Sequence, residues 1–203
     1  MNESRAASGE QRFVRLVVAT RNEGKRREIE DLLAGLGVEV LSLSAFPDAP
    51  EVEEPFETFA ENAAHKATAI ARATGEWALA DDSGLEVDAL GGAPGVRSSR
   101  IAESDPARIA WLLGRMAQVP PDCRQARFIC ALALASPQGL VGRWQGTVEG
   151  LITDEPRGAH GFGFDPVFLY PPTGMTFAEM TREEKGEVSH RGRALREFRG
   201  WLA

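Results

Sequence analysis

The sequence has few cysteines, no long apolar run and no excess of positive charge. Its two cysteines, Cys123 and Cys130, have a spacing that fits neither a zinc site nor a disulfide framework. The formal net charge of -7 disfavours a role in binding nucleic acid or an anionic membrane surface. No apolar run is long enough to span a membrane, and the polar start of the chain does not resemble a signal peptide. We therefore expect a cytoplasmic protein with no nucleic-acid or membrane partner.

The length and composition predict one folded domain. A chain of 203 residues with 43% apolar and 26% charged residues is long enough to bury one hydrophobic core. We expect residues 1–12 to form a disordered extension and residues 13–203 to form a single domain with two lobes.

The first part of the chain predicts two strands with a helix between them. Residues 13–20 and 38–43 are rich in apolar and β-branched side chains, which indicates buried strands. Gly37 stands where the intervening helix would end. The helix is indicated by one apolar stripe, formed by Ile29, Leu32, Leu33 and Leu36.

A second helix and a third strand continue this alternation. Thr58 can cap the helix, with Glu61 completing a capping box, and Gly75 can end it. A short apolar strand at residues 77–80 follows. An alternation of strand and helix is typical of an α/β fold.

The second half of the chain predicts longer strands. Residues 127–135 and 140–148 flank a proline- and glycine-containing turn, which indicates an antiparallel hairpin. A helix before them is striped by Ile109, Leu112, Leu113 and Met116. Ser189 can cap a last helix that begins near His190. We expect an α/β fold with a mixed, elongated β-sheet, flanking helices, and an active-site cleft between two lobes.

The first candidate site is the turn between the first strand and the first helix, which we name the phosphate turn. It comprises Thr20, Arg21, Asn22, Glu23, Gly24 and Lys25. The free N–H groups of a helix start and a nearby lysine favour phosphate binding. The turn is not a Walker loop, because Ala19 replaces the first glycine and Arg26 replaces the Ser or Thr that holds Mg²⁺. An ordinary strand-to-helix connection is the alternative.

The second candidate site is Asp81-Asp82-Ser83-Gly84, which follows the strand at residues 77–80. If the strand continues, the two carboxylates point to opposite sides and one of them can face the cleft. A carboxylate there suits Mg²⁺ coordination or activation of a water molecule. The alternative is an ordinary turn, since all these residue types favour turns.

The acidic loop that precedes the second helix is a third candidate. Glu51, Glu53 and Glu54 could supply a second metal ligand. A solvated surface loop is the alternative.

The fourth candidate is the segment of residues 161–166, Gly-Phe-Gly-Phe-Asp-Pro, which we name the aromatic wall. A purine ring could stack on its aromatic side chains, or these side chains could instead face the core. A fifth candidate combines Lys185 with Ser189, His190 and Arg191, whose donors match a keto oxygen or a phosphate. The alternative is a solvated helix surface.

Seven short motifs follow one another along nearly the whole chain. Their order is T-R-N-E-G-K, D-D-S-G-L, L-G-G-A-P-G-V, Q-A-R-F, G-F-G-F-D-P, T-R-E-E-K and S-H-R-G. This order and its spacing resemble the inosine/xanthosine triphosphate pyrophosphatase family, also called Ham1-like.

The resemblance implies hydrolysis of the non-standard purine nucleotides ITP, dITP and XTP to a monophosphate and pyrophosphate by a Mg²⁺-dependent homodimer. It implies that Asp82 binds Mg²⁺ and activates water, and that Glu54, or its neighbour Glu53, is the other metal ligand. The implied substrate contacts are Thr20, Arg21, Asn22, Glu23, Gly24, Lys25, Ser83, Phe162, Gly163, Phe164, Asp165, Lys185, His190 and Arg191. Adenine would be disfavoured, because its amino group would meet donors rather than acceptors.

Two positions depart from the family pattern. Arg21 stands where many members have a small residue, and Phe164 replaces the commoner Tyr or Trp. Neither departure removes an implied catalytic group, and the second removes at most one hydrogen bond.

Two other functions remain open at this stage. One is a metal-dependent phosphatase that releases orthophosphate, and the other is a sensing module that binds a nucleotide without turnover. Asp82 disfavours the sensing module, since a triphosphate binder gains nothing from added negative charge unless a metal is bound.

Overall fold

The computed structural model describes residues 15–202, so the predicted extension at residues 1–12 lies outside it. Seven strands form one sheet in the order β2-β1-β3-β4-β5-β6-β7. The strands are β1 (Arg15–Val18), β2 (Glu39–Ser42), β3 (Trp77–Val87), β4 (Gln125–Ser136), β5 (Gly139–Ile152), β6 (Phe168–Tyr170) and β7 (Met175–Thr176). The helices are α1 (Glu23–Leu33), α2 (Phe59–Thr74), α3 (Asp105–Met116), α4 (Arg182–Val188) and α5 (His190–Leu202). No helix within residues 15–202 is long and apolar enough to cross a membrane.

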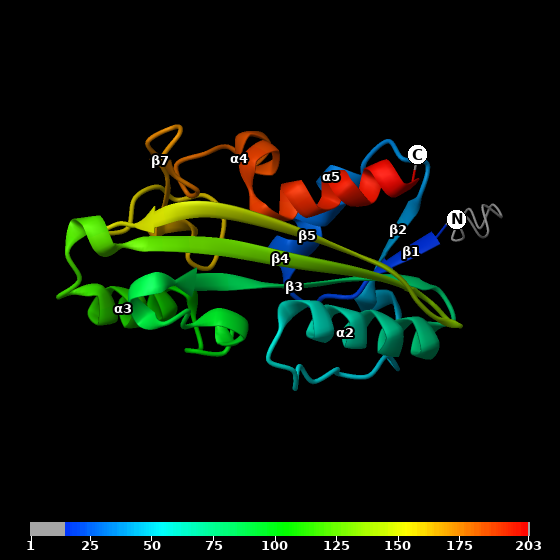
Figure 1. Ribbon diagram of the computed structural model, residues 1–203. Helices are drawn as coiled ribbons and strands as arrows, with labels where there is room; N and C mark the ends of the chain where they lie inside the picture. The colour runs from blue at the N-terminus through cyan, green and yellow to red at the C-terminus, as the bar shows by residue number, and fades with distance from the viewer. Residues whose placement is uncertain (1–14, 203) are drawn as a thin grey trace, which may run out of the picture.

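The sheet is parallel at one end and antiparallel over the rest of its width. β1 pairs in parallel with β2 and with β3, whereas each pair from β3 to β7 is antiparallel. Parallel neighbours need crossover connections, which α1 and α2 supply. The long strands β3, β4 and β5 continue well beyond this parallel part and give the molecule its elongated shape (Figure 1). The predicted α/β class with a mixed sheet and flanking helices is confirmed.

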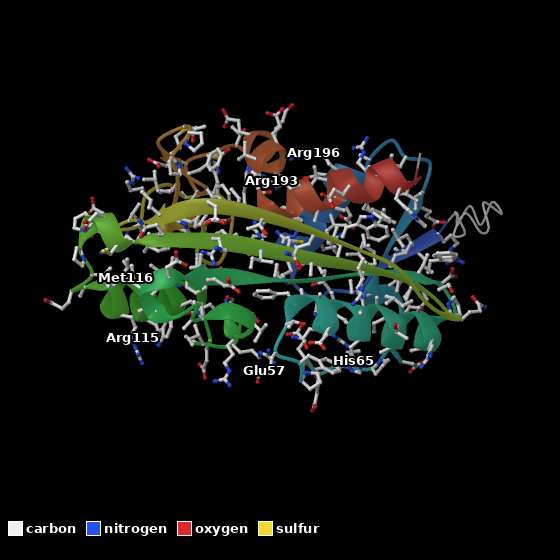
Figure 2. The ribbon with its side chains drawn as sticks, in the orientation of Figure 1. Glu57, His65, Arg115, Met116, Arg193 and Arg196 are labelled. Atoms are coloured by element: carbon white, nitrogen blue, oxygen red, sulfur yellow. The ribbon has the colours of Figure 1, made fainter. Side chains whose placement is uncertain are left out.

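Helices cover both faces of the parallel part of the sheet (Figure 1). Alternation along β1 decides which side chain meets which helix, because successive side chains of a strand point to opposite faces. Val17 packs in a core cluster with α2, whereas Leu16 and Val18 pack in another cluster with α1 and α5. Figure 2 shows the same division, with Arg193 on the α5 side of the sheet and His65 on the α2 side.

A third core fills the far end of the long strands. Leu112 and Met116 of α3 are fully buried there, together with Leu85 of β3 and Phe128 of β4. This core also contains residues of the segment between β5 and α4, among them Phe164, so the aromatic wall packs against it.

The predicted helices are present but the first ends early. α1 stops at Leu33 rather than near Gly37, because Gly35 and Gly37 adopt φ angles of 81° and 70° and turn the chain into β2. The cap of α2 is confirmed, since Thr58 accepts a hydrogen bond from the Glu61 N–H and Gly75 ends the helix in the left-handed conformation.

The three long strands β3, β4 and β5 extend beyond their predicted ranges, whereas β1 ends at Val18 and β2 spans Glu39–Ser42, short of the predicted ends at residues 20 and 43. β3 does not stop at Ala80 but continues through Val87. The alternative that residues 81–84 form an ordinary turn is therefore wrong. β4 and β5 form the predicted hairpin and extend beyond both predicted ranges. The pattern also does not predict β6, β7 or α4, although the capping box between Thr181 and Glu184 is a local signal for α4.

Replacing Gly146 by alanine should destabilise the fold. A Cβ atom at this position of β5 would lie 2.1 Å from the His190 carbonyl oxygen and 2.6 Å from the Ala194 nitrogen. Because both atoms are backbone, α5 must shift, and we expect the free energy of unfolding to fall by about 1–3 kcal/mol. Urea denaturation measures this loss.

Gly114→Ala is the matched control. This exposed glycine of α3 has no heavy atom of the described residues within 4 Å of a built Cβ outside its own helical turn. Alanine should therefore raise the free energy of unfolding by about 0.5–1 kcal/mol. Equal effects of the two substitutions would contradict close packing between β5 and α5.

Candidate active site

The two adjacent carboxylates of β3 point to opposite faces of the sheet. Because β3 stays extended through residues 81–84, Asp81 lies on the side of Leu79, which packs with α1 and α5. Asp82 lies on the side of Ala80, which packs with α2. One sequence motif therefore supplies two different chemical environments.

Asp81 is completely surrounded by hydrogen-bond donors. Its Oδ1 lies 2.5 Å from Lys25 Nζ, and its Oδ2 accepts hydrogen bonds from Arg191 Nε at 2.9 Å and Cys130 Sγ at 3.0 Å. Burial alone would raise the pKa of Asp81, but Arg191 and Lys25 hold it well below its usual value. Asp81 therefore stays ionised and fixes two cations of the site.

Asp82 has the opposite environment. It is 4% exposed, and its Oδ2 has no hydrogen-bond partner among the described residues. Burial raises the pKa of Asp82 to about 6; Lys25 and Lys66 oppose this rise and Glu54 adds to it. A buried carboxylate oxygen without a partner is costly and is typical of a group reserved for a ligand or for chemistry.

Glu54 is the acidic-loop residue that the fold brings toward Asp82. Its side chain is 17% exposed and forms an ion pair with Lys66 of α2 and another with Arg100 at 3.7 Å. Glu53, by contrast, is exposed. The sequence pattern does not predict Lys66, although a single lysine among the buried alanines of α2 is a signal for it.

The phosphate turn forms the start of α1. Asn22 caps the helix by accepting a hydrogen bond from the Lys25 N–H at 3.0 Å, and the Asn22 N–H donates to Thr20 Oγ1 at 3.1 Å. Glu23 points elsewhere, because its carboxylate binds the side chains of Arg26 and Arg27. The turn thus presents Thr20, Lys25 and backbone N–H groups at one place.

The two phenylalanines of the aromatic wall have different surroundings. Phe164 is 3% exposed and belongs to the third core, as the core-facing alternative predicts for this residue. Phe162 instead lies over the phosphate turn, where a Cβ atom on Gly24 would be 2.5 Å from its ring. The two halves of the predicted site therefore meet at Phe162 and Gly24.

Two buried cations lie against the Phe162 ring. Lys185 Nζ is 4.8 Å from the ring centroid, and the guanidinium carbon of Arg191 is 5.7 Å from it. Lys185 also binds Asp165 at 2.5 Å and Glu28 at 2.7 Å. Burial alone would lower the pKa of Lys185, but Asp165 and Glu28 raise it above its usual value, so the amine stays charged.

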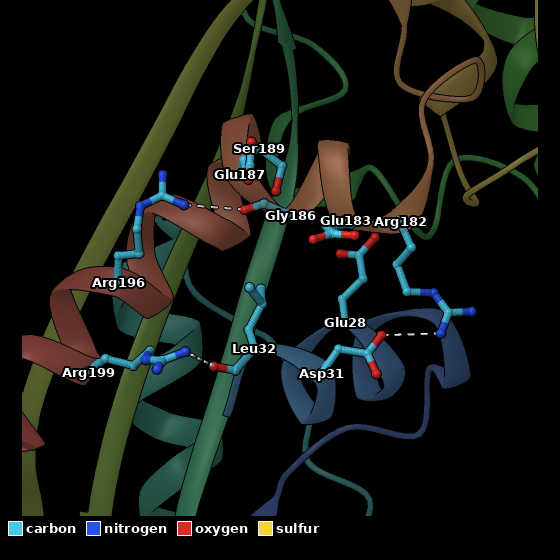
Figure 3. Close-up of a pocket in the computed structure, with 10 residues that line it drawn as sticks. All are labelled: Glu28, Asp31, Leu32, Arg182, Glu183, Gly186, Glu187, Ser189, Arg196 and Arg199. Atoms are coloured by element: carbon cyan, nitrogen blue, oxygen red, sulfur yellow. Dashed lines mark hydrogen bonds and ion pairs between the residues drawn. The ribbon is translucent and has the colours of Figure 1, made fainter. Parts of the chain in front are cut away.

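Glu28 joins the two cations, and the sequence pattern does not predict it. Its carboxylate, 13% exposed, binds both Lys185 and Arg191 from the middle of α1. Behind it, a groove of about 460 Å³ opens between α1, α4 and α5 (Figure 3). This groove is larger than the cavity at Phe162. Of the described residues that line it, only Glu28 forms ion pairs with Lys185 and Arg191.

His190 adds a neutral ring to the site. It stacks on Phe128 with ring centroids 4.7 Å apart, and its Nδ1 has no hydrogen-bond partner in the described residues. Burial, with Arg191 and Lys185 nearby, holds the pKa of His190 well below its usual value. The neutral ring is free to donate or accept one hydrogen bond at Nδ1.

One cavity joins the phosphate turn to the aromatic wall. It has a volume of about 70 Å³. Among the residues that line it are Asn22, Lys25, Ser83, Phe162, Gly163, Phe164, Asp165, Lys185, His190 and Arg191. Thr20, Arg21 and Glu54 line an adjacent cavity of about 140 Å³. Most of the predicted site residues are thus brought together, from segments far apart in the sequence.

A Mg²⁺ ion fits the donor set at Asp82. The unpaired carboxylate oxygen of Asp82 and the neighbouring Glu54 are hard oxygen ligands of the type that Mg²⁺ prefers. Within residues 15–202, however, no three His, Cys, Asp or Glu side chains form a complete metal cage. Such a site is typical of Mg²⁺ that also binds substrate phosphates and water.

The sequence profile of the Ham1 family matches residues 16–201, a range that contains every site residue described above. The chain belongs to the Ham1 family. Similar proteins are named dITP/XTP pyrophosphatase. The one from Desulforamulus reducens is 50% identical over 186 residues, covering 90% of this chain and 92% of the relative. The one from Geobacter sulfurreducens is 52% identical over 195 residues, covering 93% of this chain and 98% of the relative.

Solved structures share the fold of this Ham1-family chain. The structure of a HAM1 protein from Coxiella burnetii has a TM-score of 0.83 and 39% identity, covering 94% of this chain and 98% of that one. The nucleoside-triphosphatase / dITP/XTP pyrophosphatase from Mycobacterium abscessus has a TM-score of 0.72 and 42% identity, covering 91% and 98%. The predicted family resemblance is confirmed.

Asp82→Asn should stabilise the metal-free protein at pH 8. Folding raises the pKa of Asp82 from 3.8 to about 6, so stability present at low pH is lost as the pH rises through this window. Asparagine has no such loss, and we expect a gain of about 2–3 kcal/mol at pH 8 that disappears below about pH 4. Urea denaturation with a chelator present, repeated across this pH range, measures the gain.

Asp81→Asn is the matched control on the same strand. Its pKa is held below the usual value, so the ionised group stabilises the fold at pH 8 and this stability is lost as the pH falls. The two isosteric substitutions should therefore have opposite signs at pH 8. The same sign for both would refute the assigned environments.

Proposed function

We propose that this chain hydrolyses non-standard purine nucleoside triphosphates to the monophosphate and pyrophosphate. The observation that carries the proposal is the buried, unpaired carboxylate of Asp82, which lies within the electrostatic influence of Lys25 of the phosphate turn and of Lys66. The aromatic wall lies against the phosphate turn at Gly24 and offers the Phe162 ring, with Lys185 Nζ 4.8 Å from the ring centroid. The names of the similar proteins, dITP/XTP pyrophosphatase, support this substrate class.

In the proposed mode the triphosphate lies across the start of α1. Thr20, Asn22 and Lys25 contact its oxygens, with the free N–H groups of the helix start adding partial positive charge. Lys66 adds a cation on the α2 side of the sheet. These groups stabilise the negative charge that moves onto the departing pyrophosphate.

Asp82 acts as the base. A water molecule attacks the α-phosphorus, the bond between this phosphorus and the bridging oxygen breaks, and Asp82 accepts the proton of the water. Asp82 and Glu54 would also hold Mg²⁺, which neutralises phosphate charge and lowers the pKa of bound water. The carboxylate is available because the protein leaves its Oδ2 unpaired.

The purine is selected at the aromatic wall. Phe162 stacks on the ring, and Lys185, His190 and Arg191 face its polar edge, with Ser83, Gly163, Phe164 and Asp165 completing the surroundings. A 6-keto oxygen accepts a hydrogen bond from a charged amine, whereas the 6-amino group of adenine would oppose it and leave a buried donor unpaired.

Four further features belong to the same proposal. Residues 13–203 act as a single domain with the substrate cleft between two lobes. The active species is a homodimer, and it acts in the cytoplasm. Apart from the second copy of the chain, its partner is a small nucleotide. These features rest on the family resemblance and on the composition.

ITP with Mg²⁺ should yield pyrophosphate, ATP should yield little, and a chelator should abolish both. The reason is that the Lys185 amine would donate to the 6-keto oxygen of the base, and that Asp82 and Glu54 would need a bound cation. Coupled assays that score pyrophosphate and orthophosphate separately make the test. Orthophosphate as the product would identify a phosphatase instead, and binding without turnover would identify a sensing module.

Asp82→Asn should lower kcat for ITP about 100-fold or more, because the amide cannot accept the proton. Glu54→Gln should raise the Mg²⁺ concentration needed for half-maximal rate. Steady-state kinetics across a Mg²⁺ titration measure both effects.

Glu53→Gln is the control for the second effect, since it removes the same charge from an exposed neighbour. It should leave the Mg²⁺ requirement within about twofold, because exposed charges act weakly. A normal kcat in Asp82→Asn, or equal Mg²⁺ requirements in the two glutamine variants, would overturn these roles.

A further inference from the structure

The aromatic wall is tethered by a carboxylate from a distant helix. Oδ2 of Asp105, the first residue of α3, accepts a hydrogen bond of 2.7 Å from the Gly163 N–H, across 58 positions of sequence. Asp105 and its helix neighbour Arg108 line the same cavity as Phe162 and Lys185. None of the seven sequence motifs contains Asp105.

Two consecutive backbone amides of the wall are held in this way. The Phe162 N–H donates to Asp165 Oδ2 at 2.8 Å, and the next N–H, that of Gly163, donates to Asp105. Gly161 and Gly163 have φ angles of 74° and 62°, a region that glycine leaves easily because it has no Cβ. A segment that contains these two glycines keeps one conformation only if contacts with other parts of the chain fix it.

Asp105 itself has further contacts that restrict its position. Its Oδ1 pairs with Arg108 at 2.5 Å, and Arg108 Nε donates to the Ala102 carbonyl at 3.1 Å. Ser104 caps the helix through the Ala107 N–H, and an acidic residue in the first turn is favoured by the helix dipole. Since α3 is anchored in the third core, the carboxylate is a fixed reference point for the wall.

The position of the wall decides where the Phe162 ring lies. The ring contacts Gly24 of the phosphate turn on one side, and Lys185 Nζ is 4.8 Å from its centroid. A small rotation of the Phe162–Gly163 peptide would move the ring relative to both. The surface offered to a purine therefore depends on the hydrogen bond that Asp105 accepts.

We propose that Asp105 is a positioning residue for purine binding, which acts by fixing the Gly163 amide and thereby the stacking face of Phe162. The inference rests on the proposed function for the identity of the ligand. It assigns Asp105 no contact with the phosphates, so the effect is confined to recognition of the base.

Asp105→Ala should raise the KM for ITP about tenfold and leave kcat within about twofold, as expected for loss of one hydrogen bond to a charged acceptor. The dissociation constant of IMP, measured by calorimetry, should rise by the same factor. The inhibition constant of pyrophosphate should stay unchanged, because pyrophosphate does not reach the wall.

Conservative and control variants separate positioning from folding. Asp105→Asn keeps an oxygen that can accept from Gly163 and should restore most of the IMP affinity. Asp105→Ser keeps a residue suited to a helix start, but its side chain is too short to reach the Gly163 N–H, so this variant should bind IMP as weakly as Asp105→Ala does. It serves as the test variant if Asp105→Ala does not fold. Glu103→Ala removes an exposed carboxylate two residues earlier and should change nothing.

Unchanged IMP affinity in folded Asp105→Ser, or an equal loss of pyrophosphate and IMP affinity, would overturn the inference. A wild-type protein that binds IMP but does not turn over ITP would contradict the proposed function alone. A wild-type protein that does not bind IMP would overturn both, and the calorimetric and kinetic results together distinguish these cases.

Discussion

The extended conformation of β3 at residues 81–82 is the constraint on which the site depends. An extended strand must send neighbouring side chains to opposite faces, so a pair of adjacent aspartates cannot share one environment. Asp81 meets Lys25, Arg191 and Cys130, which keep it ionised, whereas Asp82 is buried on the other face and keeps an unpaired oxygen. One carboxylate thus stabilises the structure, and the other is held in a costly state, as is typical of a group reserved for a ligand or for chemistry.

The paired carboxylate is the start of a buried charge network that crosses the site. Asp81 binds Arg191, Glu28 binds both Arg191 and Lys185, and Lys185 binds Asp165. Removing one member of such a network leaves an uncompensated buried charge, which is far more damaging than loss of a surface ion pair. The network therefore couples the phosphate turn, through α1 and α5, to the aromatic wall.

Local patterns predict most of the fold because caps, glycines and apolar stripes act within a few residues. Thr58 and Gly75 define α2, and the hairpin follows from its turn. The continuation of β3 is different, since β4 pairs with it along its length and overrides the turn preference of its residues. Similarly, Glu28, Lys66 and Asp105 become site residues only through contacts with segments far along the chain, and spacing within one motif carries no information about such contacts.

In the proposed function, the supply of hydrogen-bond donors at the aromatic wall is what lets a cationic site discriminate between bases. The Lys185 amine has three N–H groups, and the carboxylates of Asp165 and Glu28 engage two of them. Arg191 likewise directs its three nitrogens at Asp81, Glu28 and Ser83. Because its neighbours take up most of the charge, Lys185 has one donor left, fixed in direction. A single N–H fixed in direction donates to a keto oxygen and disfavours an amino group, whereas a freely rotating lysine would attract any polar ligand.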